Sequence, residues 1–140
     1  MTIRTPVLRE KALPVEIINE EIRELVENMI ETMYAEGGAG LAAPQVGVSK
    51  RIIIVDTEER GPIVLINPVI IRKSGESKEE EGCLSVPNRE EDILRYKKIK
   101  VRYQDIDGNW KNGRYSDLNA VSIQHELDHL DGILFIDRLK

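Results

Sequence analysis

Apolar side chains recur at helical spacing in the first quarter of the chain. Ile22, Leu25, Val26, Met29, Ile30 and Met33 lie at offsets 0, 3, 4, 7, 8 and 11. These offsets place them on one face of a helix. Asn19 is suited to cap the start of this helix, and Gly37 can end it, because glycine accepts the left-handed conformation that often follows a helix.

Patterns typical of β-strands occupy the middle of the chain. A loop of small residues at 37–45 is followed by three runs rich in β-branched residues, at 51–56, 63–67 and 69–72. A charged, turn-prone segment at 73–81 comes next. These patterns predict strands that are separated by turns.

A hairpin and a second helix are predicted toward the C-terminus. Residues 99–103 alternate with period two, and residues 110–115 return after an Asp-Gly turn, as in a β-hairpin. Ser116 or Asp117 can cap a last helix, which continues until Gly132 stops it.

The order of these elements predicts the fold class. Helices at both ends with β-rich material between them favour an α+β fold with a mostly antiparallel sheet. No stretch of roughly 20–50 residues recurs, and no segment resembles an interdomain linker. The 140 residues fit one domain. We therefore expect a single catalytic domain over residues 1–140, with antiparallel strands around the C-terminal helix.

The last predicted helix contains the motif H-E-x-x-H, at His125, Glu126 and His129. Two histidines four residues apart on a helix differ in direction by about 40°, so both imidazoles can reach one ion. Glu126 is suited to take a proton from a water on the metal and to pass it on. Apolar residues form two stripes on this helix, which predicts a largely buried helix with the metal at the bottom of an apolar pocket.

Cys83 is the candidate for a third ligand. A catalytic divalent site typically uses three protein ligands and leaves a fourth position for water. Cys83 is the only cysteine, and His125 and His129 are the only histidines. Two simpler interpretations stay open: a histidine pair beside a salt-bridging Glu126, and a Cys83 that acts as a small buried apolar residue.

Two other classes of protein use part of this pattern. A zincin-type endopeptidase also has H-E-x-x-H, but it usually takes its third ligand from downstream, where Asp131 and Asp137 are poorly placed. A structural zinc site or an inactive binding module is the other class. A closed structural site needs four ligands, and the fourth would have to be Glu126 or Asp128.

Gln45 is a candidate donor to the reacting oxygen. Hydrolysis of an amide builds negative charge on the carbonyl oxygen, and neutral donors aimed at that point lower the barrier. The Gln45 amide can supply one donor, and the backbone N–H after Cys83 a second. By residue type alone Gln45 would be an ordinary loop residue, and only the neighbouring motifs favour the catalytic interpretation.

Composition and charge argue against several partners. The net charge is −5, and the one basic stretch, at 97–102, is explained by alternation along a strand, so no sequence-specific nucleic-acid binding is expected. No apolar run exceeds four residues, so no membrane span is expected. The N-terminus lacks the apolar core of a signal peptide, and a lone cysteine fits a reducing compartment. We expect a cytoplasmic protein.

Three segments together resemble the peptide deformylase family. They are Gly-Ala-Gly-Leu-Ala-Ala-Pro-Gln at 38–45, Glu-Gly-Cys-Leu-Ser at 81–85 and Gln-His-Glu-Leu-Asp-His at 124–129. All three stand in the order of the family, and the match covers about residues 9–139. The resemblance implies removal of the formyl group from the N-formylmethionine of newly synthesised polypeptides. Nascent N-formylmethionyl peptides are then the expected partners, with transient contact to the ribosome.

The resemblance also implies a metal site. Cys83, His125 and His129 would hold one divalent ion, commonly Fe²⁺, which Zn²⁺, Ni²⁺ or Co²⁺ can replace. Glu126 would be the general acid/base.

Roles in oxyanion stabilisation and substrate binding follow from the same resemblance. The Gln45 amide and the Leu84 N–H would stabilise the oxyanion, and the backbones at Gly40 and Gly82 would pair with the extended peptide. The helix positions that match the methionine pocket are Leu118, Val121 and Ser122.

The chain departs from the usual family pattern in three places. Ala39 replaces a branched residue, which predicts a wider methionine pocket. Glu90 stands where many members have an arginine, with Arg89 beside it, so Arg89 is an uncertain anchor for substrate. The sequence ends eight residues after Gly132, so we expect it to lack the C-terminal helix of many bacterial members. Where that helix aids ribosome docking, this protein must do without it or use another surface.

Overall fold

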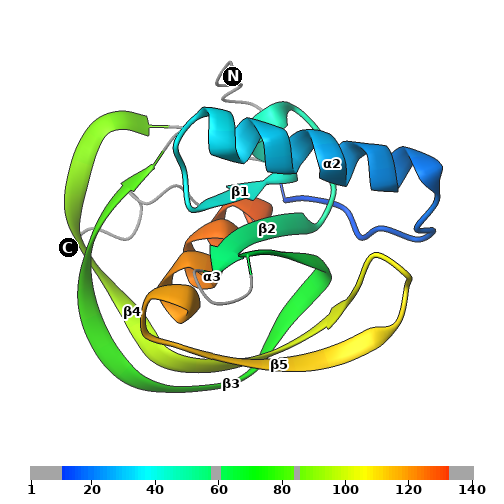
Figure 1. Cartoon of the computed structure of the whole chain (residues 1–140). Coiled ribbons are helices and arrows are strands. Elements are labelled where there is room, and N and C mark those ends of the chain that lie inside the picture. The colour runs from blue at the N-terminus through cyan, green and yellow to red at the C-terminus, as the bar shows by residue number, and fades with distance from the viewer. Residues whose placement is uncertain (1–10, 58–60, 84–85, 133–140) are drawn as a thin grey trace.

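One antiparallel sheet and two helices form the described part of the chain (Figure 1). The computed structural model describes the backbone of residues 11–57, 61–83 and 86–132, and their side chains except those of 77–94. The elements are α2 (Glu20–Ala35), β1 (Gly40–Ala42), η1 (Ala43–Val46), β2 (Ile52–Thr57), β3 (Gly61–Cys83), β4 (Val86–Gln104), β5 (Trp110–Ser116) and α3 (Asp117–Leu130). Neither helix is long and apolar enough to cross a membrane.

The sheet is a meander in which each strand pairs with the next. Its order is β1-β2-β3-β4-β5, and all four pairings are antiparallel. The long strands β3 and β4 curve, and together with β5 they wrap around α3, while α2 lies on the other side of β1 and β2 (Figure 1). This arrangement confirms the predicted α+β class with an antiparallel sheet around the C-terminal helix.

Strand β2 is buried on both faces, which explains its unbroken apolar run. Ile53 and Val55 belong to the core that contains α3, and Ile52 and Ile54 belong to the core that contains α2. All four side chains are 0% exposed. Because successive side chains of a strand point to opposite faces, β2 packs against α3 on one face and against α2 on the other.

Helix α2 has the predicted bounds. The Asn19 side chain accepts a hydrogen bond from the Ile22 N–H at 3.1 Å, and Gly37 follows the helix with a φ of 70°. Its apolar stripe is directed at β1 and β2, with Val26, Met29 and Met33 buried. The periodic pattern was sufficient here because one face is buried and the other is charged.

The segment at 73–81 differs from its prediction. It was expected to be turn-prone, yet β3 continues through it to Cys83 and pairs with β4 along its length. Side chains at 73–76 are exposed, so charged residues are tolerated there. Cross-strand hydrogen bonding, which a single segment of sequence does not reveal, overrides the local propensity.

Candidate active site

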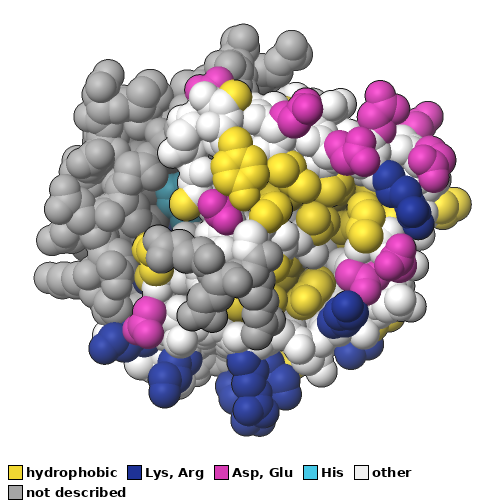
Figure 2. Space-filling view, viewed as in Figure 1, with side chains coloured by type: hydrophobic (Ala, Val, Ile, Leu, Met, Phe, Trp, Pro, Cys, Tyr) yellow, Lys and Arg dark blue, Asp and Glu magenta, His cyan; other side chains and the backbone are white. Residues whose placement is uncertain are grey.

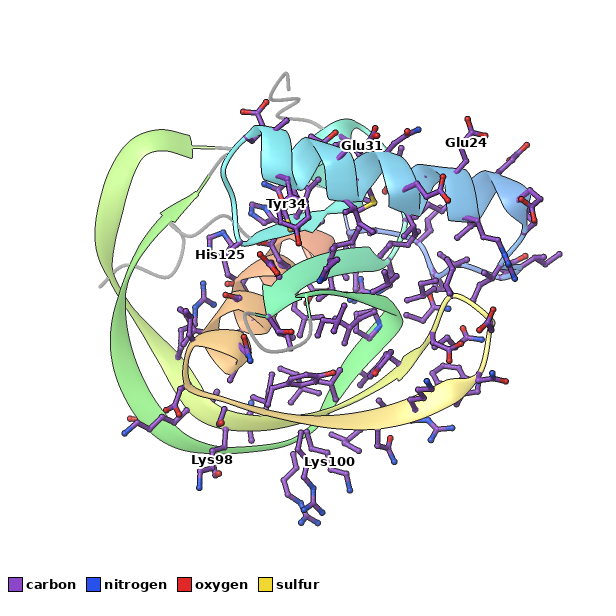
Figure 3. All side chains as sticks on the ribbon, viewed as in Figure 1. Glu24, Glu31, Tyr34, Lys98, Lys100 and His125 are labelled. Atoms are coloured by element: carbon purple, nitrogen blue, oxygen red, sulfur yellow. The ribbon has the colours of Figure 1, made fainter. Side chains whose placement is uncertain are left out.

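Two histidines and a glutamate of α3 converge on one point. His125, Glu126 and His129 each offer one ligand atom, and these atoms lie within 4.8 Å of one another. The two imidazole rings meet edge to face, with centroids 5.1 Å apart. His125 is partly exposed, whereas Glu126 is 5% and His129 1% exposed. The cluster therefore opens to solvent on the His125 side, where Figure 2 shows histidine surface in cyan and Figure 3 labels the residue.

The buried histidine is held in its neutral form. Burial lowers the pKa of His129 to about 3, and the neighbouring His125 and Arg95 act in the same direction. A neutral imidazole keeps a nitrogen lone pair, which is the form that binds metal.

The residues present fit a divalent metal ion. Donor atoms that share one ion at about 2.1 Å each lie at most roughly 4.2 Å apart. The observed limit of 4.8 Å is close to that separation. Imidazole nitrogens and a carboxylate are also donors that such ions accept.

Strand β1 touches the acid of this cluster. A Cβ atom added to Gly40 would lie 2.7 Å from Oε2 of Glu126 and 3.1 Å from its Cγ. Only glycine leaves room for the carboxylate at this point. The position of Glu126 between α3 and β1 therefore depends on the absence of a side chain at residue 40.

Substituting alanine for Gly40 should reduce hydrolysis at this site by about ten- to a hundredfold, because the new methyl group displaces the Glu126 carboxylate by a few tenths of an ångström or more. Steady-state kinetics with an amide substrate of the enzyme gives the loss. In a double-mutant cycle with Glu126→Asp, the two effects should be non-additive, since both act on one carboxylate. Simple additivity would show that Gly40 acts elsewhere.

Gln45 is buried next to α3, the helix that contains His125 and His129. It lies in η1, which contacts α3, and it is 3% exposed. Its Oε1 accepts a hydrogen bond from the Ala42 N–H at 2.8 Å. This bond fixes the orientation of the amide, so the NH₂ is the end that can donate to another group. The predicted donor role requires this orientation.

The structure describes the backbone of Gly82 and Cys83 at the end of β3, but not their side-chain surroundings and not Leu84. Gly82 and Cys83 are the last paired residues of β3, opposite Glu90 and Val86. The side chain of Cys83 and all of Leu84 lie outside the described part of the chain. The sulfur ligand, the second oxyanion donor and the substrate contact of Gly82 remain predictions, as does any role of the Arg89 side chain.

The predicted methionine-pocket residues lie on the α3 stripe that contains His125. Leu118 is 63% exposed, Val121 is 5% exposed and Ser122 is partly buried. The stripe thus runs from solvent toward the histidine cluster. Its role in binding methionine remains a prediction.

A buried ion pair behind the cluster was not predicted. Arg95 of β4 donates to Asp128 of α3 with Nη1 and Oδ2 2.6 Å apart, and their side chains are 3% and 8% exposed. The only signal in the sequence was an aspartate inside the motif of a buried helix, which needs a cationic partner. The sequence does not indicate which of 20 basic residues supplies it.

A second unpredicted contact joins α3 to β4 beside the histidine cluster. The Gln124 side chain donates to the Tyr96 carbonyl at 2.7 Å and accepts from the Tyr96 N–H at 2.8 Å. This amide extends the hydrogen-bonding pattern of a strand. It fixes the helix one residue before His125.

Comparisons with known proteins give one consistent answer. The sequence profile of the family described as polypeptide deformylase matches residues 1–140. The peptide deformylase of Dictyoglomus thermophilum is 54% identical over 133 residues, which cover 95% of this chain and 86% of that protein. The peptide deformylase of Acidobacterium capsulatum is 49% identical over 138 residues, with coverages of 96% and 81%.

Solved structures agree with the sequence relatives. The crystal structure of peptide deformylase from Thermotoga maritima has a TM-score of 0.93 and 45% identity, and the match covers 96% of this chain and 92% of that one. A Synechococcus elongatus peptide deformylase in complex with actinonin has a TM-score of 0.92 and 44% identity, with coverages of 96% and 74%.

Proposed function

Because this chain belongs to the polypeptide deformylase family, we propose that the α3 cluster carries out the reaction of that family. The enzyme is a metal-dependent hydrolase that removes the formyl group from the N-formylmethionine of new polypeptides. The observation that supports this site is the convergence of His125, Glu126 and His129.

His125 and His129 hold one divalent ion together with Cys83, and Fe²⁺ is the proposed native metal, replaceable by Zn²⁺, Ni²⁺ or Co²⁺. The neutral state of His129 and the convergence of the two histidines support the imidazole ligands, whereas Cys83 is proposed from the resemblance to the family. When bound, such an ion acidifies a coordinated water and polarises a carbonyl.

Glu126 moves the proton. In the proposed reaction a water oxygen adds to the formyl carbon while the Glu126 carboxylate takes the proton that the water releases. The C–N bond then breaks, and Glu126 gives the proton to the departing nitrogen. The products are formate and a free amino terminus. The burial of Glu126 against Gly40 holds the carboxylate in one place for both transfers.

Two neutral donors stabilise the oxyanion in this proposal, the Gln45 NH₂ and the Leu84 N–H. Both would point at the formyl oxygen as negative charge develops there. The support for Gln45 is its burial and the hydrogen bond from Ala42, which leaves the NH₂ as the donating end.

The substrate is proposed to bind as an added strand. Strand β1 is the first strand of the sheet order, and it pairs with β2 alone within the described residues. An extended peptide can therefore pair with the backbone at Gly40, and Gly82 would pair on the peptide's other side. In this proposal the formyl end of the peptide would lie beside Glu126, because Gly40 lies against that side chain. Leu118, Val121 and Ser122 would enclose the methionine side chain.

The substrate also determines the proposed cellular setting. Formylated nascent chains are made on ribosomes, so we place this single domain of residues 1–140 in the cytoplasm, with transient ribosome contact. The lone cysteine, used here as a metal ligand, fits a reducing compartment.

Metal analysis combined with a formyl-Met peptide assay tests this proposal. Protein purified without oxygen should contain about one metal ion per chain and release formate. Activity lost in air and restored by Ni²⁺ would identify iron. Protein that binds metal but releases no formate would contradict the assignment of this site.

Cys83→Ser, assayed in parallel, should weaken metal binding at least about tenfold, because a neutral hydroxyl is a far poorer ligand than a thiolate. Thermal unfolding of both metal-free proteins distinguishes a lost ligand from a damaged fold. Unchanged metal content in a folded variant would remove Cys83 from the ligand set.

A further inference from the structure

The outer face of the sheet carries positive charge that the proposed reaction does not use. On β4, Lys98, Lys100 and Arg102 are two residues apart, so they stand on the same face of the strand. Figure 3 shows Lys98 and Lys100 directed away from α3 and from the histidine cluster.

Strand pairing adds two arginines to this row. Lys100 lies opposite Arg72 of β3 on one side and Arg114 of β5 on the other. Directly opposed residues in a sheet share a face. The structure therefore assembles a basic face from three strands, formed by Arg72, Lys98, Lys100, Arg102 and Arg114.

Acidic residues are rare among the described side chains of the three strands. Of residues 69–76, 95–104 and 110–116, only Glu76 is acidic. The chain as a whole has a net charge of −5, and α2 alone contributes five glutamates. Figure 2 shows the blue cluster below and the magenta cluster over α2. The molecule thus presents one cationic face on an acidic protein.

The five cations are available to an anionic partner. None of them forms an ion pair with another residue among those whose side chains the structure describes. Four of them, all but Arg102, line a hollow of about 410 Å³, and Ser74 and Ser116, which flank Lys98, also line it. The Arg102 guanidinium lies 4.8 Å from the ring centroid of Trp110, which is 50% exposed.

We propose that the basic face binds the sugar–phosphate backbone of RNA without reading its sequence. Neighbouring strands lie about 4.8 Å apart and alternate residues about 6.7 Å apart, so the cations span roughly 10 by 13 Å. A nucleic-acid duplex presents about one charge per 1.7 Å of axis, so several phosphates fit this area. Arginine forks hold phosphates in pairs of hydrogen bonds, and serine hydroxyls are common phosphate donors.

The hollow favours RNA over a membrane surface. A ridge of phosphates can enter a concave surface, whereas a flat layer of lipid headgroups meets only its rim. The choice of RNA as the polyanion rests on the proposed function, because a nascent chain is presented by an RNA-rich particle. Binding to that particle would raise the local concentration of enzyme around its substrate.

Binding of a fluorescent 20-nucleotide RNA, as a single strand and as a duplex, tests the proposal with the metal-loaded full chain. Lys98→Gln/Lys100→Gln should weaken binding about tenfold or more at 0.1 M salt and lower the salt slope by about 2. Lys98→Arg/Lys100→Arg should retain binding. Lys11→Gln/Arg23→Gln removes the same charge elsewhere on the surface and should weaken binding less than about twofold.

Three results would overturn the proposal: no RNA binding by the wild type, equal losses in the two glutamine variants, or tight binding to phosphatidylserine vesicles with none to RNA. Hydrolysis of a short free formyl-Met peptide should be unchanged in Lys98→Gln/Lys100→Gln. A wild-type chain that binds RNA but hydrolyses no peptide would refute the proposed function and leave the RNA site standing.

Discussion

Replacing Glu126 by glutamine should lower kcat by about two to four orders of magnitude, as expected when a general acid/base is removed. The amide has nearly the same shape, so it still fits beside Gly40, where Glu126 already lies against the β1 backbone. It cannot accept the proton that the attacking water must lose. Metal content should stay near one ion per chain, because His125 and His129 are untouched.

The rate of formate release at saturating formyl-Met peptide gives kcat. Metal analysis of the same sample gives the metal content. Glu31→Gln is a matched control, since Glu31 is an exposed residue of α2, labelled in Figure 3, and its variant should keep the wild-type rate. A Glu126→Gln enzyme near the wild-type rate would overturn the proposed proton transfer. Loss of metal from that variant would instead make Glu126 a ligand.

Local periodicity was enough to predict the two helices and the geometry of the motif. In α2 a single apolar stripe is matched to one buried face, so the helical spacing indicates its orientation directly. In α3 the four-residue spacing of His125 and His129 fixes their relative direction on any regular helix. The convergence of these side chains with Glu126 therefore follows from short-range rules.

Features created by pairing between distant segments were not visible in the sequence. The extension of β3 through residues 73–81 depends on its pairing with β4. The basic face depends on the same register, because Arg72 and Arg114 join Lys100 only across strands. Read along one strand, the basic stretch at 97–102 is explained by alternation alone.

The buried Arg95–Asp128 pair also joins distant segments, so the sequence alone did not reveal it. Breaking this pair should strongly reduce the stability of the fold. Arg95→Met should lower the free energy of unfolding by about 3–5 kcal/mol, because the Asp128 carboxylate, 8% exposed, would remain buried without its guanidinium. Urea denaturation gives this difference. Lys97→Met, two residues further along β4 at an exposed position, should change stability by less than about 0.5 kcal/mol.

Replacing both partners distinguishes stability from positioning. Arg95→Met/Asp128→Leu should recover most of the lost stability, since a buried ion pair and a well-packed apolar pair are often nearly equivalent. The 2.6 Å contact also holds α3 against β4 next to His129. We therefore expect the stable double variant to bind metal more weakly than the wild type. If the double variant instead matched the wild type in metal affinity and kcat, the ion pair would serve the fold alone. A loss of stability below about 1 kcal/mol in Arg95→Met would contradict the stabilising role of the pair.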